Sequence, residues 1–100
     1  MSRREEALQR TEKEILAEKA ATLGRAGERL EDALRLVAER RRALEQAPPG
    51  ADREAALANY RQARVRALDA RRTLIIQREA IGLRTHRIVD QQFPEPPALG

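Results

Sequence analysis

Residues 60–88 read YRQARVRALDARRTLIIQREAIGLRTHRI, and every seventh position within them is apolar. These positions are Tyr60, Ala67, Leu74, Ile81 and Ile88. An earlier series has the same spacing: Leu16, Leu23, Leu30, Val37 and Leu44. A repeat of seven places each series along one side of an α-helix, which is typical of two helices packed in a coiled coil. The two series therefore predict two long helices that share one apolar seam.

The segment Ala47-Pro48-Pro49-Gly50 separates the two series. Proline lacks a backbone donor and restricts the residue before it, so the helix cannot continue through this segment. We predict one all-α domain over residues 1–100, a long antiparallel two-helix hairpin. Its expected parts are a first helix over 3–46, a turn over 47–51, a second helix over 52–92 and a tail over 93–100. Ser2 and Glu5 predict a capping box for the first helix, and Asp52 predicts the N-cap of the second.

The antiparallel register brings Leu44 near Tyr60 and, at the far end, Leu16 near Ile88. Gly24, Gly27 and Gly82 then fall at nearly the same level. Each glycine inside a helix costs up to ~1 kcal/mol against alanine, so a compensating role is expected. A close helix crossing is our preferred interpretation, ahead of a local bend or backbone access for a ligand.

The composition favours thin, solvated helices, because 36% of residues are charged and only 2% are aromatic. A two-helix hairpin of this length buries little surface, so association is expected. The chain has no cysteine, which excludes disulfides and thiolate metal sites. The N-terminal residues lack the apolar region of a secretory signal, and no apolar run approaches the ~20 residues that span a bilayer. We therefore expect a cytoplasmic protein that does not bind membranes.

The second predicted helix carries another apolar stripe on the side away from the seam. We predict that this stripe is an oligomer interface, and that two hairpins dimerise into a four-helix bundle. Tolerated surface aliphatics and a different protein partner are the alternatives. The residues predicted at the interface are Val65, Leu68, Ile76 and Leu83.

Positive charge gathers in the middle of the chain, where residues 35–78 hold 11 basic and 5 acidic side chains. Folding at the prolines makes this segment one physical end of the hairpin. Arginine pairs well with carboxylates and phosphates, so this end is a candidate site for an acidic protein partner. Nucleic acid is the alternative ligand, and a solvated face that binds nothing is the interpretation against which both are weighed. The residues predicted to bind the acidic partner are Arg40, Arg41, Arg42, Arg61 and Arg64.

His86 is the only histidine, and a lone imidazole without neighbouring ligands does not form a zinc site. No phosphate-binding loop, nucleophile elbow or metalloprotease motif is present. We therefore expect no catalytic residue, no metal and no cofactor. The predicted function is a non-enzymatic interaction or scaffolding module that self-associates, and the alternative is a nucleic-acid-binding protein.

Three segments together resemble a family of small bacterial all-helical proteins of unknown function. They are AEKAATLGRAG at 17–27, QREAIGLR at 77–84 and FPEPP at 93–97, and the likeness extends over roughly residues 17–97. The resemblance implies no activity, cofactor or catalytic residue. It marks the glycine-containing level of the rod as the most distinctive part of the chain.

Overall fold

The first helix, α1, spans Arg3–Gln46 in the computed structural model, which describes all 100 residues. Its predicted capping box is formed. The backbone N–H of Glu5 donates to Oγ of Ser2 at 3.1 Å, and the N–H of Ser2 donates to the Glu5 carboxylate at 3.4 Å. These two bonds satisfy donors that a helix N-terminus otherwise leaves free. The helix ends at Gln46, and its C-cap residue Ala47 is followed by the two prolines of the turn.

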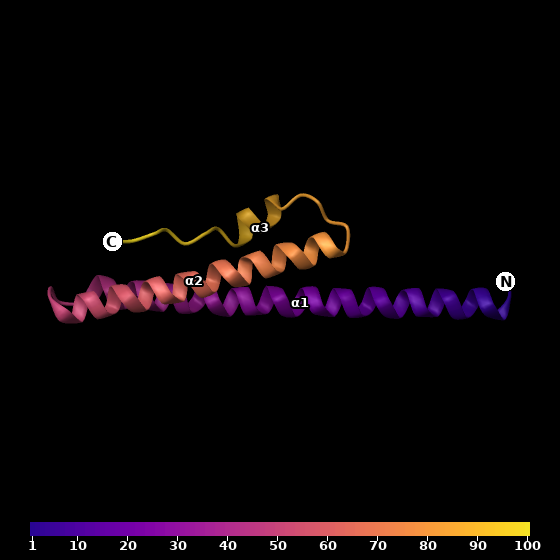
Figure 1. The fold of residues 1–100 in the computed structure, drawn as a ribbon, viewed down its shortest axis with the longest axis horizontal. Helices are drawn as coiled ribbons and strands as arrows, with labels where there is room; N and C mark the ends of the chain where they lie inside the picture. Colours follow the sequence, from indigo (N-terminus) through magenta and orange to yellow (C-terminus); the bar gives the residue numbers. More distant parts are fainter.

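The second helix, α2, spans Ala51–Ala80 and lies antiparallel beside α1 (Figure 1). It begins earlier than expected, because Gly50 rather than Asp52 is the N-cap residue. Gly50 has a φ of 107°, a conformation that glycine adopts without the steric penalty of a Cβ atom. Asp52 lies instead in the first helical turn, where its negative charge faces the positive end of the helix dipole.

Side chains from both series fill the seam between α1 and α2 in two adjoining clusters. The buried members from α1 include Leu30, Val37 and Leu44, and those from α2 include Tyr60 and Leu74. The predicted all-α antiparallel hairpin is therefore confirmed. The molecule measures 73 × 20 × 15 Å, and its radius of gyration of 19.6 Å exceeds the ~13 Å of a compact domain this long.

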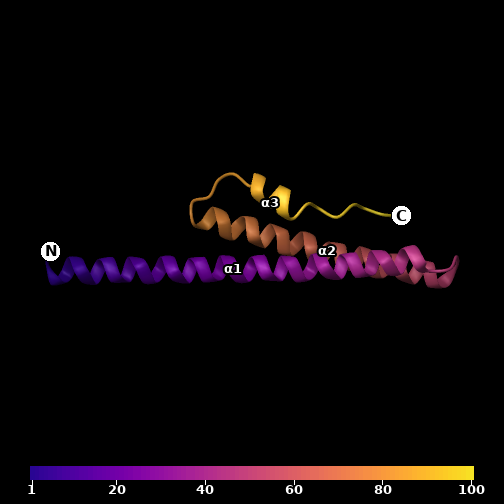
Figure 2. The same ribbon diagram turned by 180° about the vertical axis from the view of Figure 1, so that it is seen from behind.

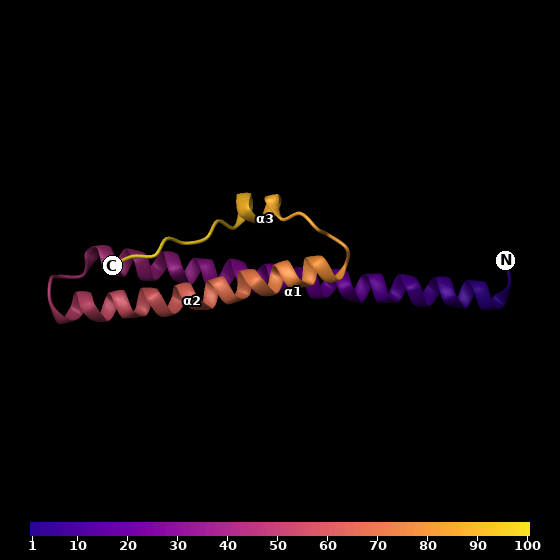
Figure 3. The ribbon, with the colours of Figure 1, turned by 45° about the horizontal axis from the view of Figure 1, so that its top comes forward.

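The second helix does not continue to residue 92, so the prediction for 52–92 was wrong. α2 stops at Ala80, and the chain turns back over the hairpin as a third helix, α3, which spans Arg87–Gln92. Residues 93–100 then run in extended form along α2 toward the turn end (Figures 2 and 3). The C-terminal segment, residues 83–100, is thus a third layer on one side of the rod.

Gly82 provides the physical reason for the break. The N–H of Gly82 donates to the carbonyl of Glu79, and the N–H of Leu83 donates to that of Arg78, both at 3.0 Å. With a φ of 92° at Gly82, this pair of bonds is a Schellman motif, which ends helices. The expected close crossing is also wrong, since a Cβ added to Gly24, Gly27 or Gly82 would meet nothing within 4 Å. Gly82 is a helix stop.

The early end of α2 changes the packing at the end of the rod opposite the turn. The expected pair of Leu16 and Ile88 is not formed, and both side chains are exposed. Val89 enters the seam instead and packs with Ala26, Leu30 and Leu74. Because α1 is longer than α2, its residues 3–20 extend past the end of α2 as a single helix, hereafter the overhang (Figure 1). No helix in the chain has the length and apolar character that crossing a membrane requires.

Candidate functional site

Three arginines of α2 hold the C-terminal segment, and we name them the arginine ladder. Arg64, Arg71 and Arg78 are seven residues apart, so they share one side of the helix. Nε of Arg64 donates to the carbonyl of Pro96 at 2.8 Å, and Nε of Arg71 donates to that of Phe93 at 3.1 Å. Nη2 of Arg78 donates to the carbonyl of Thr85 at 3.0 Å. The ladder therefore binds the main chain of the returning segment.

Arg71 is the central member and makes the most contacts. Besides the carbonyl of Phe93, its guanidinium contacts the carboxylates of Asp90 and Glu95, the latter at 3.3 Å. Its side chain is only 12% exposed, whereas both carboxylates remain largely in solvent. Such charge-assisted bonds are stronger than neutral ones, and here they fix the point where α3 passes into the extended tail.

Tyr60 and three apolar side chains complete the attachment. The hydroxyl of Tyr60 donates to the carbonyl of Pro97. Val89 is buried and Phe93 is half-buried in the cluster around Leu30, while Leu99 packs on the cluster around Tyr60. The C-terminal segment is thus attached by apolar contacts at both ends and by donated hydrogen bonds between them.

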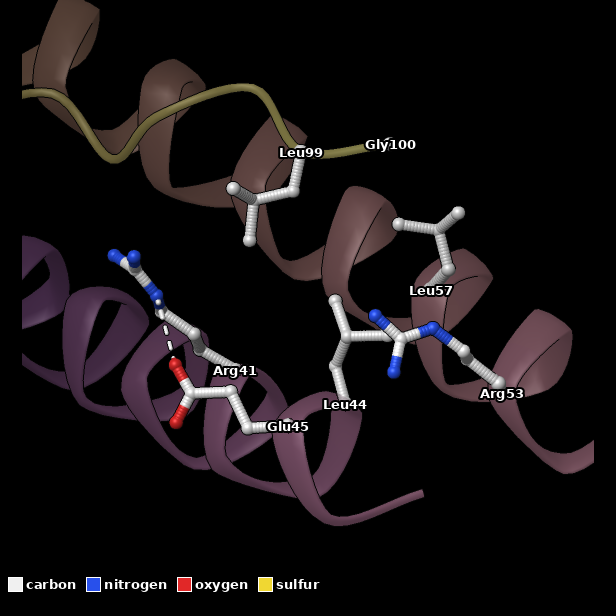
Figure 4. A pocket seen from close by; sticks show the side chains of 7 residues that line it. All are labelled: Arg41, Leu44, Glu45, Arg53, Leu57, Leu99 and Gly100. Atoms are coloured by element: carbon white, nitrogen blue, oxygen red, sulfur yellow. Dashed lines mark ion pairs between the residues drawn. The ribbon is translucent and has the colours of Figure 1, made fainter. Parts of the chain in front are cut away.

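The largest pocket lies at the turn end and has a volume of about 320 Å³. Figure 4 shows α1 residues on one side, α2 residues on the other and the chain terminus alongside α2. The Arg41 and Glu45 side chains form an ion pair at 3.3 Å, so they neutralise each other. This pocket is a shallow, mixed surface without a nucleophile or a paired acid and base. The lining residues are Arg41, Leu44, Glu45, Arg53, Leu57, Leu99 and Gly100.

His86 lies at the start of α3 and contacts α2. Its Nδ1 accepts a hydrogen bond from Nε of Arg78 at 3.3 Å. Its Nε2 is enclosed without a hydrogen-bond partner, and the nearest carboxylate, that of Glu79, is 3.9 Å away. No three His, Cys, Asp or Glu side chains gather closely enough to hold a metal ion. His86 therefore acts as an acceptor that helps position the ladder.

The four residues predicted at an oligomer interface do not share one bare surface. Val65 and Ile76 are exposed on α2, at 56% and 55%, and Leu83 is exposed beside the chain reversal. Leu68 is half-buried and lines a second pocket, of about 240 Å³, together with Arg71 and Glu95. The C-terminal segment covers that part of the stripe, where a second copy was expected.

The predicted acidic-partner residues also divide into two groups. Arg40, Arg42 and Arg61 are exposed and make no hydrogen bond or ion pair within the chain. Arg41 is paired with Glu45, and Arg64 belongs to the ladder. Arg64 is therefore occupied by an intramolecular acceptor, a role that the sequence-based interpretation missed.

Arg71, Arg78, Phe93 and Leu99 were not among the predicted site residues. The signal that could have identified the two arginines is the seven-residue repeat of Arg64, Arg71 and Arg78, parallel to the apolar series. The overhang was missed too, because the helix expected over 52–92 would have covered it. Every residue from Met1 to Ala21 is exposed, including Leu8, Ile15 and Leu16 at 57%, 45% and 63%.

The chain belongs to the family described as "Family of unknown function (DUF6665)", whose model matches residues 1–99. None of the curated proteins compared with the chain matches it, and none of the solved structures does.

Proposed function

We propose that this protein is a non-enzymatic interaction module that self-associates as a dimer through its uncovered apolar surfaces. The observation that carries the proposal is the overhang, a run of helix with no neighbour in the chain. A helix without neighbours is only marginally stable in water, because most helical stability in proteins comes from packing of an apolar face. Leu8, Ile15 and Leu16 supply that face.

A second copy suits the overhang better than a charged partner does. Residues 3–20 hold five basic and five acidic side chains, so two overhangs meet without net repulsion. Full burial of one leucine or isoleucine side chain contributes about 1.5–3 kcal/mol, and each copy offers three. An isologous contact uses each of these side chains twice, which makes even a short surface effective.

The exposed side chains of α2 extend the proposed interface along the rod. Val65 and Ile76 are more than half exposed, and Leu83 is exposed just after the end of α2. Leu68 contributes only its uncovered part. We assign these four residues, with the overhang, to the surface that a second copy buries.

Light scattering over a concentration series tests this proposal. We expect a dimer that Ile15→Glu and Ile76→Glu each weaken at least tenfold, because a charge buried without a partner is costly. Gln9→Glu and Gln62→Glu are the matched controls, since they place the same carboxylate at exposed polar positions of the same helices. A wild-type chain that stays monomeric at millimolar concentration would refute self-association.

The arginine-rich turn end supports a second candidate, binding of an acidic protein or, alternatively, of nucleic acid. Arg40, Arg42 and Arg61 are exposed and have no acceptor within the chain. Phosphate binding would weaken steeply as salt rises, because each contact releases counterions. Mobility shift of RNA and DNA at low salt, with the Arg40→Glu, Arg42→Glu double variant as control, tests the nucleic-acid alternative. No shift with wild-type protein would reject it.

A further inference from the structure

The C-terminal segment lies on a surface formed by the arginine ladder, Tyr60 and the two apolar clusters, hereafter the groove. This groove is chemically matched to the segment. Prolines 94, 96 and 97 have no N–H, so the tail around them offers mainly carbonyl acceptors. The groove supplies hydrogen-bond donors to these carbonyls, from the arginine ladder, which has only donors, and from the hydroxyl of Tyr60. These hydrogen bonds are made to backbone carbonyls, so they do not require the segment to belong to the same chain.

The apolar contacts make the groove specific for this segment. Phe93 lies against the cluster around Leu30, and Leu99 lies against the cluster around Tyr60. A bulky apolar residue thus stands at each end of the proline-containing tail. Glu95 adds a charged contact to Arg71 between them. The peptide that satisfies all of these contacts is the C-terminal segment itself, in the same chain or in another copy.

A short hinge, which includes residues 83–86 of the C-terminal segment, connects the rest of that segment, residues 87–100, to the hairpin. Residues 81–86 lie between α2 and α3, and Leu83, Arg84 and Thr85 are exposed. The hinge lies at the end of α2, on the side away from α1 and at the level where the overhang begins (Figures 1 and 2), so an opened segment leaves the rod where α1 loses its neighbour. Exchange of an identical element across such a hinge is a low-cost route to a dimer.

We infer that two copies of this chain exchange their C-terminal segments, so that residues 87–100 of each copy occupy the groove of the other. This inference rests on the proposed self-association and names how it occurs. Contacts in the groove are the same in the exchanged form and in the closed form, in which the segment occupies the groove of its own chain. Because the tethered segment has an effective concentration near millimolar, the closed form is favoured below that protein concentration. The exchanged form therefore needs an additional gain, and the uncovered overhang with Leu8, Ile15 and Leu16 supplies it.

Isotope-mixed crosslinking tests the exchange directly. The chain has no cysteine, so Leu57→Cys with Leu99→Cys places two thiols across the groove, where the native side chains line one pocket. Equal amounts of ¹⁴N- and ¹⁵N-labelled chains are unfolded, refolded together and treated with a short bismaleimide. Mass spectrometry then reads the crosslinked peptides of the dimer fraction. Val65→Cys with Ala98→Cys, which line another pocket of the same groove, is a second pair should the first disturb packing.

We expect about half of the crosslinked peptides to carry one label of each kind, the statistical value for random pairing. Crosslinks between like labels alone, in a protein that light scattering shows to be dimeric, overturn the exchange and leave self-association standing. A monomer with like-label crosslinks overturns both. If neither cysteine pair crosslinks, the segment does not occupy the groove, and the exchange is refuted.

Gly82→Ala gives an independent test on the full chain. The closed form needs a φ of 92° at this residue, which alanine resists, whereas an opened hinge can continue as helix. We expect the dimerisation constant to rise about tenfold or more. Gly24→Ala is the control, because Gly24 has ordinary helical geometry within α1 and an added Cβ there would meet nothing within 4 Å. An unchanged or smaller constant for Gly82→Ala contradicts the exchange.

Discussion

The hydroxyl of Tyr60 donates a hydrogen bond to the carbonyl of Pro97, a residue 37 positions away in the sequence. The ring of Tyr60 is completely buried between α1 and α2, so one side chain joins the seam of the hairpin to its outer layer. This hydrogen bond also positions the tail, because Pro97 lies two residues before Leu99, whose side chain packs on the same cluster as Tyr60. Tyr60 is therefore the point where all three layers of the rod meet.

Tyr60→Phe separates the two contributions of this side chain. The substitution keeps the buried ring and removes only the donor, so we expect a loss of about 0.5–1.5 kcal/mol in the free energy of unfolding. Urea denaturation followed by circular dichroism measures it. Tyr60→Ala also removes the ring and should cost about 3–5 kcal/mol. Equal losses in the two variants would show that the hydroxyl, rather than the ring, dominates.

Arg71 and Arg72 are adjacent arginines with opposite expected behaviour. Arg71→Ala removes bonds to Phe93, Asp90 and Glu95 from a side chain that is only 12% exposed, so we expect a loss of about 1–3 kcal/mol. Arg72 is 74% exposed and lies 3.7 Å from Asp69, so Arg72→Ala should cost no more than about 0.5 kcal/mol. Thermal or urea unfolding of both variants measures the difference.

Hydrogen exchange adds a local measurement to this pair. Arg71→Ala should speed amide exchange in α3, because its attachment to α2 is weakened. Arg72→Ala should leave exchange in α3 unchanged. Equal effects of the two substitutions on α3 would mean that the ladder does not hold the C-terminal segment.

The hairpin could be predicted from the sequence because its signal is periodic. Leu30, Val37 and Leu44 repeat at seven residues, and the prolines end the first series unambiguously. The end of α2 could not be predicted in the same way, because Ile81 and Ile88 continue the second series past the break. The periodic signal does not distinguish a helix that continues from one that stops at Gly82.

A glycine within a helical pattern is compatible with a close crossing, a bend or a stop. Tertiary packing selects the stop here, because folding back at Gly82 buries Val89 and brings Phe93 onto the same cluster. The groove also could not be predicted from the sequence. Four of its hydrogen bonds go to backbone carbonyls, those of Thr85, Phe93, Pro96 and Pro97, and a backbone acceptor leaves no residue-specific signature.

Two glycines offer a matched test of this assignment. Gly27 lies within α1, and an added Cβ would meet nothing within 4 Å, so Gly27→Ala should raise stability by about 0.5–1 kcal/mol. Gly50 has a φ of 107°, so Gly50→Ala should lower stability by about 1–2 kcal/mol. Denaturant midpoints of the two variants measure both effects. A loss with Gly27→Ala would indicate a close approach at that level after all.

Leu16 and Leu30 belong to the same series on the same helix, yet they differ completely in burial. Leu30 is 0% exposed, so Leu30→Ala should cost about 2–5 kcal/mol at any protein concentration. Leu16 is 63% exposed in the single chain, so Leu16→Ala should change the stability of a monomer by less than about 0.5 kcal/mol.

A dimer changes the expectation for Leu16 but not for Leu30. If a second copy covers the overhang, the cost of Leu16→Ala should grow with protein concentration, because association contributes to apparent stability by mass action. Unfolding of both variants at low micromolar and at near-millimolar concentration measures this dependence. A cost for Leu16→Ala that stays small at both concentrations would leave the overhang without a partner, whatever the state of the seam.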